Sequence, residues 1–218
     1  MRAEAYLDEK TLPSQLQDWL ADLGPGRFQL SPRRCALLLV DVQNVFAHPD
    51  GRSYLPAASA IMPNVLALLH AWRRAGECVA FTRHCHRRDE RSGSLMSFWG
   101  NAIDCRSRGS QLLDELNPAG GEPVFRKSTY DAFHRTSLEE WLRRKDRDQV
   151  LVAGLLTHLC VETTVRSAFV RDYQPFVAAD ATATVSRDIH FASLRSMHHG
   201  FATVMASGAA VRALDVRG

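Results

Sequence analysis

Three side chains with complementary chemistry each follow a short apolar run in this sequence. Asp41 comes directly after CALLLV (35–40), Lys127 follows EPVF (122–125), and Cys160 follows VLVAG (150–154). A thiol attacks a carbonyl carbon, an ammonium group beside it favours the thiolate, and a carboxylate takes the thiol proton and delivers it to a leaving amine. These residue types predict a hydrolase that forms a thioester, which water then hydrolyses with Asp41 as the base.

The surroundings of Cys160 favour a nucleophile. In the following segment, Val161, Val165, Ala168 and Phe169 have helical spacing, so Cys160 is predicted at a strand-to-helix turn. Unpaired N–H groups and the helix dipole at such a turn favour the thiolate, and the same N–H groups can face a developing oxyanion. A buried cysteine at the start of a core helix shows the same local pattern, so its position alone assigns no role.

Alternating strand and helix patterns must bring the three side chains together. Strands are expected near 35–40, 77–83, 122–125, 150–154, 176–179 and 201–205, with helices at 57–75, at 137–144, from 161 and from 189. This alternation predicts an α/β fold of three α/β/α layers around a mainly parallel sheet. Ligands bind beyond the C-terminal ends of such strands, so Asp41, Lys127 and Cys160 are expected at one sheet edge. Alone, Asp41 would be a turn residue and Lys127 a surface residue.

Composition bounds the class of protein. The chain has 218 residues, 45% of them apolar and 23% charged, with a formal net charge of +3, which suits one globular domain and gives no sign of a nucleic-acid partner. Without a long apolar stretch or an apolar signal sequence, we expect a cytoplasmic enzyme with no membrane partner. Polar residues 1–34, with a short helix at 15–23, are expected to form an arm on the domain at 35–218 or on a neighbouring subunit.

The five cysteines, at positions 35, 78, 85, 105 and 160, are odd in number and irregularly spaced. No CxxC pair is present, which argues against a zinc ribbon and against a disulfide scaffold. We therefore expect all five thiols to be reduced.

Longer motifs carry a family resemblance. The segments LLLVDVQNVF, FRKSTYDAF and GLLTHLCVETTVRSAFVRDY, with VAADATA at 177–183 and the later His190, resemble the isochorismatase-like cysteine hydrolases over about residues 35–207. The resemblance implies an Asp–Lys–Cys triad, which falls on Asp41, Lys127 and Cys160. It also implies a Rossmann-like fold, a small-molecule substrate and a homodimer or homotetramer.

The resemblance extends to the backbone before the cysteine. It implies a cis peptide bond between Leu155 and Leu156, which turns the Leu156 N–H toward the substrate. The backbone N–H groups of Leu156 and Cys160 are then the expected oxyanion-hole donors.

Two reaction classes compete within the resemblance. Amidases of this family need the cysteine, whereas siderophore-type isochorismatases resemble AHIG at THLC (157–160) and cleave a vinyl ether through the aspartate. This chain is similar to the second branch at His158 and FHRTSLEEWL, but it has Cys160, and no carrier domain is expected after residue 207. Cleavage of a C–N bond in a small amide or ureido compound is therefore favoured. Vinyl-ether hydrolysis through Asp41 and a catalytically silent oligomeric binding protein stay as alternatives.

Substrate contacts are expected around the same sheet edge. Arg83 is a candidate for clamping a carboxylate, although an ion pair would explain it equally well. The long segment 84–109 is expected to be a loop at the site. Further candidates are the aromatic residues that could wall a small pocket and a histidine near the nucleophile: Phe46, Trp99, Tyr130, Phe133 and His158.

A metal site is the weaker interpretation of the histidines after the second strand. Nicotinamidases resemble DWHP there, with a later histidine completing a metal site, whereas this chain has His84 and His86 in RHCHR (83–87). Two ring nitrogens plus water can hold zinc, but no convincing third ligand follows in the sequence. We therefore expect no metal and no cofactor, and nicotinamidase is the poorer fit.

Overall fold

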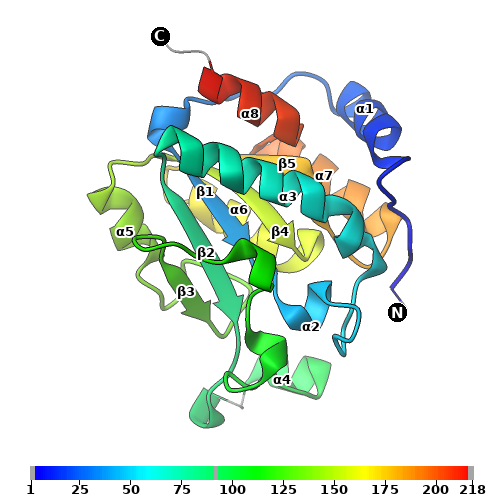
Figure 1. The fold of residues 1–218 in the computed structure, drawn as a ribbon, viewed down its shortest axis with the longest axis vertical. Helices are drawn as coiled ribbons and strands as arrows, with labels where there is room; N and C mark the ends of the chain where they lie inside the picture. The colour runs from blue at the N-terminus through cyan, green and yellow to red at the C-terminus, as the bar shows by residue number, and fades with distance from the viewer. Residues whose placement is uncertain (1–2, 91–92, 216–218) are drawn as a thin grey trace.

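A parallel sheet forms the centre of the computed structural model, which describes residues 3–90 and 93–215 (Figure 1). Its strands are β1 (Cys35–Val40), β2 (Val79–His84), β3 (Val124–Lys127), β4 (Gln149–Leu155), β5 (Gln174–Ala183) and β6 (Thr203–Met205). They form a six-stranded sheet in the order β3-β2-β1-β4-β5-β6, and each neighbouring pair is parallel. The predicted α/β fold with three layers is confirmed.

Helices cover both faces of the sheet. In Figure 1, α3 and α8 lie in front of the strands and α6 lies behind them. The α-helices are α1 (Leu12–Leu23), α2 (Asn44–Ala47), α3 (Pro56–Ala75), α4 (Ser94–Trp99), α5 (Leu138–Arg144), α6 (Glu162–Phe169), α7 (Arg187–Gly200) and α8 (Ser207–Asp215). A one-turn π-helix, Thr157–Val161, precedes α6.

Local signals explain where these elements begin and end. Every residue of β1 and β4 is buried, as expected for central strands covered on both faces. Helix α3 begins with Pro56, and it ends at Gly76, whose φ of 70° is left-handed. Helix α7 begins after Ser186, whose hydroxyl accepts a hydrogen bond from the Ile189 N–H.

The N-terminal segment packs on α7 of the same chain. Trp19 of α1 is 1% exposed, and its ring lies 4.9 Å from the ring of His190 and 6.2 Å from that of Phe191. Nearer the N-terminus, the Tyr6 hydroxyl accepts a hydrogen bond from the Thr184 N–H. Residues before the first strand therefore reach the end of β5, close to the sheet edge that carries the site.

The expectation of five reduced thiols is wrong for one pair. Cys85 and Cys105 form a disulfide with their Cα atoms 4.9 Å apart, whereas Cys35, Cys78 and Cys160 are free. The two cysteines are 20 residues apart in sequence, and they meet because the chain folds back on itself. The His86 N–H bonds the Ile103 carbonyl at 2.7 Å, and the Cys105 N–H bonds the His86 carbonyl at 3.2 Å.

In this six-stranded sheet the strand order reverses between β1 and β4. The chain adds β2 and β3 on one side of this switch point and β5 and β6 on the other. In open α/β sheets, ligands bind beyond the carboxyl ends of the strands at such a point. In the described residues, no helix is long and apolar enough to cross a membrane.

Candidate active site

Asp41, Lys127 and Cys160 meet at the C-terminal edge of the sheet. Lys127 ends β3, and its Nζ lies 2.6 Å from Asp41 Oδ2 and 3.1 Å from Cys160 Sγ. The Lys127 ammonium also donates to the Thr129 carbonyl at 3.0 Å. All three catalytic candidates are buried, so the ion pair and the thiol interact with little screening by water.

The backbone around Asp41 is shaped for this contact. Asp41 follows β1 with a φ of 50°, a left-handed conformation that is uncommon outside glycine and concentrates at functional sites. On the neighbouring strand, Gly154 has a φ of 117°, and a Cβ there would lie 2.1 Å from the Val40 carbonyl oxygen. Glycine at this position therefore allows β4 to approach the end of β1 closely.

Thr82 holds the Asp41 carboxylate in place. Its hydroxyl donates to Asp41 Oδ1 at 2.6 Å and accepts from the Asp41 N–H at 3.1 Å. Burial alone would raise the pKa of Asp41, but Lys127, with His84 and Thr82, outweighs burial and holds that pKa below its usual value. Burial alone would lower the pKa of Lys127, but Asp41 and Cys160 raise it above its usual value. The pair is therefore ionised.

Cys160 lies in the π-helical turn Thr157–Val161, which begins two residues after the last residue of β4. The peptide bond between Leu155 and Leu156 is cis, at the position that the family resemblance implies. Burial raises the pKa of the Cys160 thiol, and Lys127 offsets this effect only in part. Desolvation of Cys160 thus opposes the thiolate that the helix start is expected to favour.

His84 and His86 lie beside the triad candidates. His84 Nδ1 is 3.5 Å from Lys127 Nζ and 3.2 Å from the Thr129 carbonyl, and His86 Nε2 is 3.1 Å from the Ser128 carbonyl. Burial, with Lys127 adding to it, lowers the pKa of His84 to about 4, and burial also lowers the pKa of His86. Both rings are therefore neutral at pH 7.

A metal ion would compete with Lys127 for the same position. One ligand atom each of Asp41, His84 and Cys160 lies within 4.8 Å of the others, which is close enough for a shared ion. The Lys127 ammonium contacts all three of these side chains and already supplies the positive charge there. These donors therefore fit an ammonium-centred site better than a zinc site.

A cavity of about 420 Å³ opens next to Cys160, and we call it the Cys160 cavity. It receives residues from the N-terminal segment, the loop after α2, the end of β2, α4 and the turn before α6. The lining residues are Ala3, Phe46, Arg52, Ser53, Tyr54, Leu55, His84, His86, Leu95, Trp99, Asn101, Ile103, Tyr130, Leu156, Leu159, Cys160 and Val185.

The structure brings only some of the predicted substrate contacts to this cavity. Phe46, Trp99 and Tyr130 line it, and the Trp99 indole N–H donates to the Tyr130 hydroxyl at 2.5 Å. The segment 84–109 also contributes to it, as predicted, but with helix α4 inside the segment.

Three predicted contacts lie elsewhere. Arg83 donates to Gln111 Oε1 at 3.1 Å and lines a different surface pocket, because alternate residues of a strand point to opposite sides. Phe133 packs 5.8 Å from the ring of Tyr173 after a turn in which its N–H bonds Asp131. His158 faces Thr184 through its Nδ1 and is outside the cavity lining.

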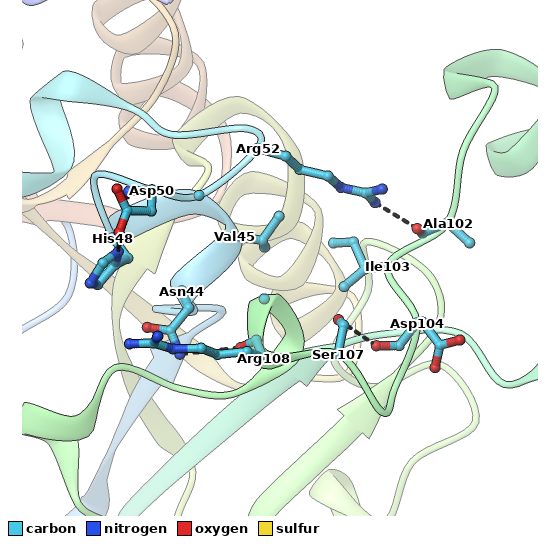
Figure 2. Close-up of a pocket in the computed structure, with 12 residues that line it drawn as sticks. Asn44, Val45, His48, Asp50, Arg52, Ala102, Ile103, Asp104, Ser107 and Arg108 are labelled. Carbon is cyan, nitrogen blue, oxygen red and sulfur yellow. Dashed lines mark hydrogen bonds and ion pairs between the residues drawn. The ribbon is translucent and has the colours of Figure 1, made fainter.

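A second cavity, of about 340 Å³, adjoins the first. Figure 2 shows that Arg52 extends from its loop toward Ala102 on one side of it, while Asn44 and Arg108 lie below. The two cavities share Arg52 and Ile103. Arg52 therefore lies between the Cys160 cavity and its neighbour.

Several residues of the site carry little signal in the sequence. Thr82 lies one residue before the predicted candidate Arg83, and period-2 alternation along β2 was the signal that could have placed its side chain beside Asp41. Gln43 cross-links the site, because its amide accepts from the His84 N–H at 2.8 Å and donates to the Ser110 carbonyl at 2.8 Å. Ala3 and Arg52 come from loop segments whose position depends on tertiary packing.

Comparisons with known proteins assign the chain to a family. A family model described as the isochorismatase domain matches residues 35–209. The chain is 36% identical to nicotinamidase 3 of Arabidopsis thaliana over 170 residues, which covers 77% of this chain and 82% of that protein. It is 30% identical to enterobactin synthase component B of Escherichia coli, covering 89% of this chain but spanning only 65% of that protein.

A solved structure gives the same result for the fold. The crystal structure of a cysteine hydrolase from Pseudomonas syringae pv. phaseolicola superimposes with a TM-score of 0.84 at 28% identity. The match covers 88% of this chain and 97% of that one.

Proposed function

The chain belongs to the isochorismatase family of hydrolases, and we propose that it cleaves a C–N bond of a small amide or ureido compound through a thioester on Cys160. The observation that carries this proposal is the position of the Lys127 ammonium, 3.1 Å from Cys160 Sγ and 2.6 Å from Asp41 Oδ2. A nucleophile thus lines the cavity, and a cation that stabilises its anion and a base for its proton lie buried directly behind it.

The first step is attack by sulfur on the carbonyl carbon. The thiol is protonated in the protein alone, whereas the low pKa of Asp41 keeps its carboxylate ionised and able to accept the thiol proton. The Lys127 ammonium stabilises the thiolate as it forms. The backbone N–H groups of Leu156 and Cys160 are the proposed donors to the oxyanion of the tetrahedral intermediate.

The second step releases the amine and then the acid. Asp41, now protonated, gives its proton to the leaving nitrogen, so that ammonia or an amine departs and a thioester remains on Cys160. Asp41 then accepts a proton from water as the water attacks the thioester. The products are a carboxylic acid and ammonia or an amine, and the thiol is restored.

Vinyl-ether hydrolysis is the alternative within the family. It needs a protonated acid to deliver a proton to carbon, and the low pKa of Asp41 disfavours that role at neutral pH. Cys160 has no part in such a reaction. The contact between the Lys127 ammonium and Cys160 Sγ, which only the amidase uses, therefore favours the amidase.

Turnover by single-site variants tests the proposal. Ammonia release is measured from a panel of small primary amides and ureido acids, and pyruvate release from isochorismate. Cys160→Ala should lower kcat for the amides by about a thousandfold or more, because the nucleophile is lost. Cys78→Ala, which changes a free cysteine outside the cavity, is the matched control and should retain activity.

Pyruvate release from isochorismate tests the alternative reaction. If pyruvate is released from isochorismate, and if Cys160→Ala retains that activity while Asp41→Asn loses it, the vinyl-ether reaction replaces the amidase. Thermal unfolding of Cys160→Ala shows whether this variant is inactive because it lacks the nucleophile or because it does not fold.

A further inference from the structure

Two consecutive residues of the π-helical turn are held by side chains from other elements. The Thr157 hydroxyl lies 2.9 Å from His190 Nδ1 on α7, and His158 Nδ1 is hydrogen-bonded to the Thr184 hydroxyl directly after β5. Thr157, Thr184 and His190 are completely buried, so water competes little with these two contacts. Cys160 follows two residues after His158, and both contacts therefore act on the turn that presents the nucleophile.

The N-terminal segment touches the partner residue in each of these contacts. The Tyr6 hydroxyl accepts a hydrogen bond from the Thr184 N–H at 3.0 Å, and the Tyr6 ring lies 5.8 Å from the ring of His190. Trp19 of α1 packs on the same histidine at 4.9 Å, and Figure 1 shows α1 beside α7. Tyr6 and Trp19 both precede residues 35–209, which the family model matches. A segment outside the matched domain thus contacts both supports of the turn.

The two held residues lie between the proposed oxyanion donors. Thr157 and His158 come after Leu156 and before Cys160, whose N–H groups are those donors. The Val161 N–H donates to the Leu156 carbonyl at 3.2 Å and closes the turn. A shift of this turn would therefore move both N–H groups relative to the substrate carbonyl. Such donors are effective only when they are aligned with the developing charge, so a small displacement is enough to slow the reaction.

We propose that Tyr6 is a positioning residue for the oxyanion hole. Its hydroxyl fixes Thr184, which holds His158, and its ring helps Trp19 to fix His190. Tyr6 is outside the lining of the Cys160 cavity, so it acts through these residues and not on the substrate. The inference rests on the proposed amidase function, because the oxyanion belongs to that reaction.

General stabilisation of the fold by the N-terminal segment is the competing explanation. A loss of general stability would lower the unfolding midpoint and leave kcat of the folded protein unchanged. A displaced oxyanion hole would instead lower kcat and leave KM nearly unchanged, because its donors stabilise the transition state more than the bound substrate. The two explanations therefore differ in kcat.

The kinetic test uses Tyr6→Phe, which removes the hydroxyl and keeps the ring beside His190. For amide hydrolysis, kcat should fall about tenfold, and KM should change by less than about twofold. Tyr173→Phe is the matched control, since it removes a hydroxyl that bonds Arg143 outside the cavity, and it should keep the wild-type kcat. A wild-type kcat in Tyr6→Phe, or a change confined to KM, overturns the inference.

A double-mutant cycle tests the route through Thr184. Thr184→Val removes the hydroxyl that bonds His158 and keeps the backbone N–H that bonds Tyr6. This variant should lower kcat by a factor similar to that of Tyr6→Phe, and the double variant should be no slower than the slower single one. If the two factors multiply instead, Tyr6 does not act through Thr184 and the proposed route is wrong.

Hydrogen exchange separates this inference from the proposed function. Amide exchange in the wild-type protein and in Tyr6→Phe is compared by mass spectrometry without substrate. Residues 156–161 should exchange about tenfold or more faster in the variant, whereas residues 35–40 of β1 should keep their rate. That result supports the hold of Tyr6 on the turn even if no amide is cleaved and the proposed function fails. Unchanged exchange at 156–161, or equal acceleration of both segments, overturns the inference.

Discussion

At the scale of single residues, Lys127 organises the site. Its ammonium contacts Asp41, Cys160, Thr129 and His84, so protein groups surround the three N–H donors that a lysine has. Lys127 is therefore placed to stabilise the thiolate and to keep Asp41 ionised rather than to bind substrate. Removing it would leave a buried carboxylate without its partner, a change that typically costs several kcal/mol.

Thr82→Val tests how the Asp41 carboxylate is held. The hydroxyl donates to Asp41 Oδ1 at 2.6 Å, and a hydrogen bond to the ionised form lowers the pKa of a carboxyl. Its loss should raise the pKa of Asp41, so the acidic limb of the pH profile of kcat/KM should move to higher pH. The expected loss of unfolding free energy is about 1 kcal/mol.

The control for this variant is Thr203→Val, which removes a buried hydroxyl from the distant strand β6. It should leave the pH profile in place. An unshifted acidic limb in Thr82→Val would show that Thr82 has no part in positioning or ionising Asp41.

His190 gives a prediction for stability against pH. Its ring is buried beside Trp19, its Nδ1 lies 2.9 Å from the Thr157 hydroxyl, and burial lowers its pKa to about 3. An unfolded histidine has a pKa near 6.5, so the stability gained by keeping His190 neutral is complete above that pH. It is lost as the pH falls from 6.5 toward 3, by about 1.4 kcal/mol per pH unit.

His190→Gln should therefore flatten the fall in unfolding free energy between pH 6 and pH 4, measured by urea titration at each pH. The exposed His199→Gln should retain the wild-type slope. Equal slopes in all three proteins would mean that His190 is already protonated in the folded state.

At the scale of elements, the strands could be predicted, but the pocket only in part. Continuous apolar runs identified β1 and β4 to within a residue or so, and the rule for parallel sheets placed Asp41, Lys127 and Cys160 at one edge. The π-helical turn, α4 and α8 were not predicted, because short elements of this kind depend on tertiary contacts more than on local pattern.

Three of the six predicted substrate contacts lie outside the cavity for a related reason. Tyr130 reaches the Cys160 cavity, whereas Phe133 turns toward Tyr173, although the two are neighbours in sequence. In irregular segments, local hydrogen bonds decide where a side chain points, and the bond from the Phe133 N–H to Asp131 is an example. Sequence alone likewise did not indicate that Ala3 would line the cavity, since its segment is positioned by the bond from the Glu4 N–H to the Val185 carbonyl.

Ala3→Phe tests whether the N-terminal segment forms a wall of the site. Ala3 is half-buried and lines the Cys160 cavity, so a phenyl ring there should take up space that substrate uses. We expect KM to rise by about tenfold for the bulkier amides and less for small ones, with kcat and the unfolding midpoint little changed.

Ala5→Phe, two positions later and exposed, is the matched control and should leave KM unchanged. If Ala3→Phe also leaves KM unchanged for every substrate, the N-terminal segment forms no part of the working site.

At the scale of the whole molecule, one covalent link ties the site segment together. The Cys85–Cys105 disulfide joins the residue after β2 to the far end of the segment that carries α4. That segment supplies Trp99, Asn101 and Ile103 to the cavity. The sequence did not predict this pair, because nothing in the spacing of five cysteines selects one partner for another.

Thiol titration in denaturant checks the pairing. Without reductant, three cysteines should react, namely Cys35, Cys78 and Cys160, and after reduction all five should react. Cys85→Ser should release Cys105 and give four reactive thiols before reduction. Five reactive thiols in the unreduced wild-type protein would contradict the disulfide.

The proposed mechanism depends most on a covalent bond between the substrate and Cys160. The measurement that tests it is the intact mass of the protein after brief mixing with the best amide substrate and an acid quench. The predicted result is a mass increase equal to the acyl group, located in the peptide that contains Cys160 and accompanied by a burst of ammonia. Ammonia release by the wild-type protein with no burst and no adduct, together with undiminished turnover by Cys160→Ala, would contradict the thioester mechanism.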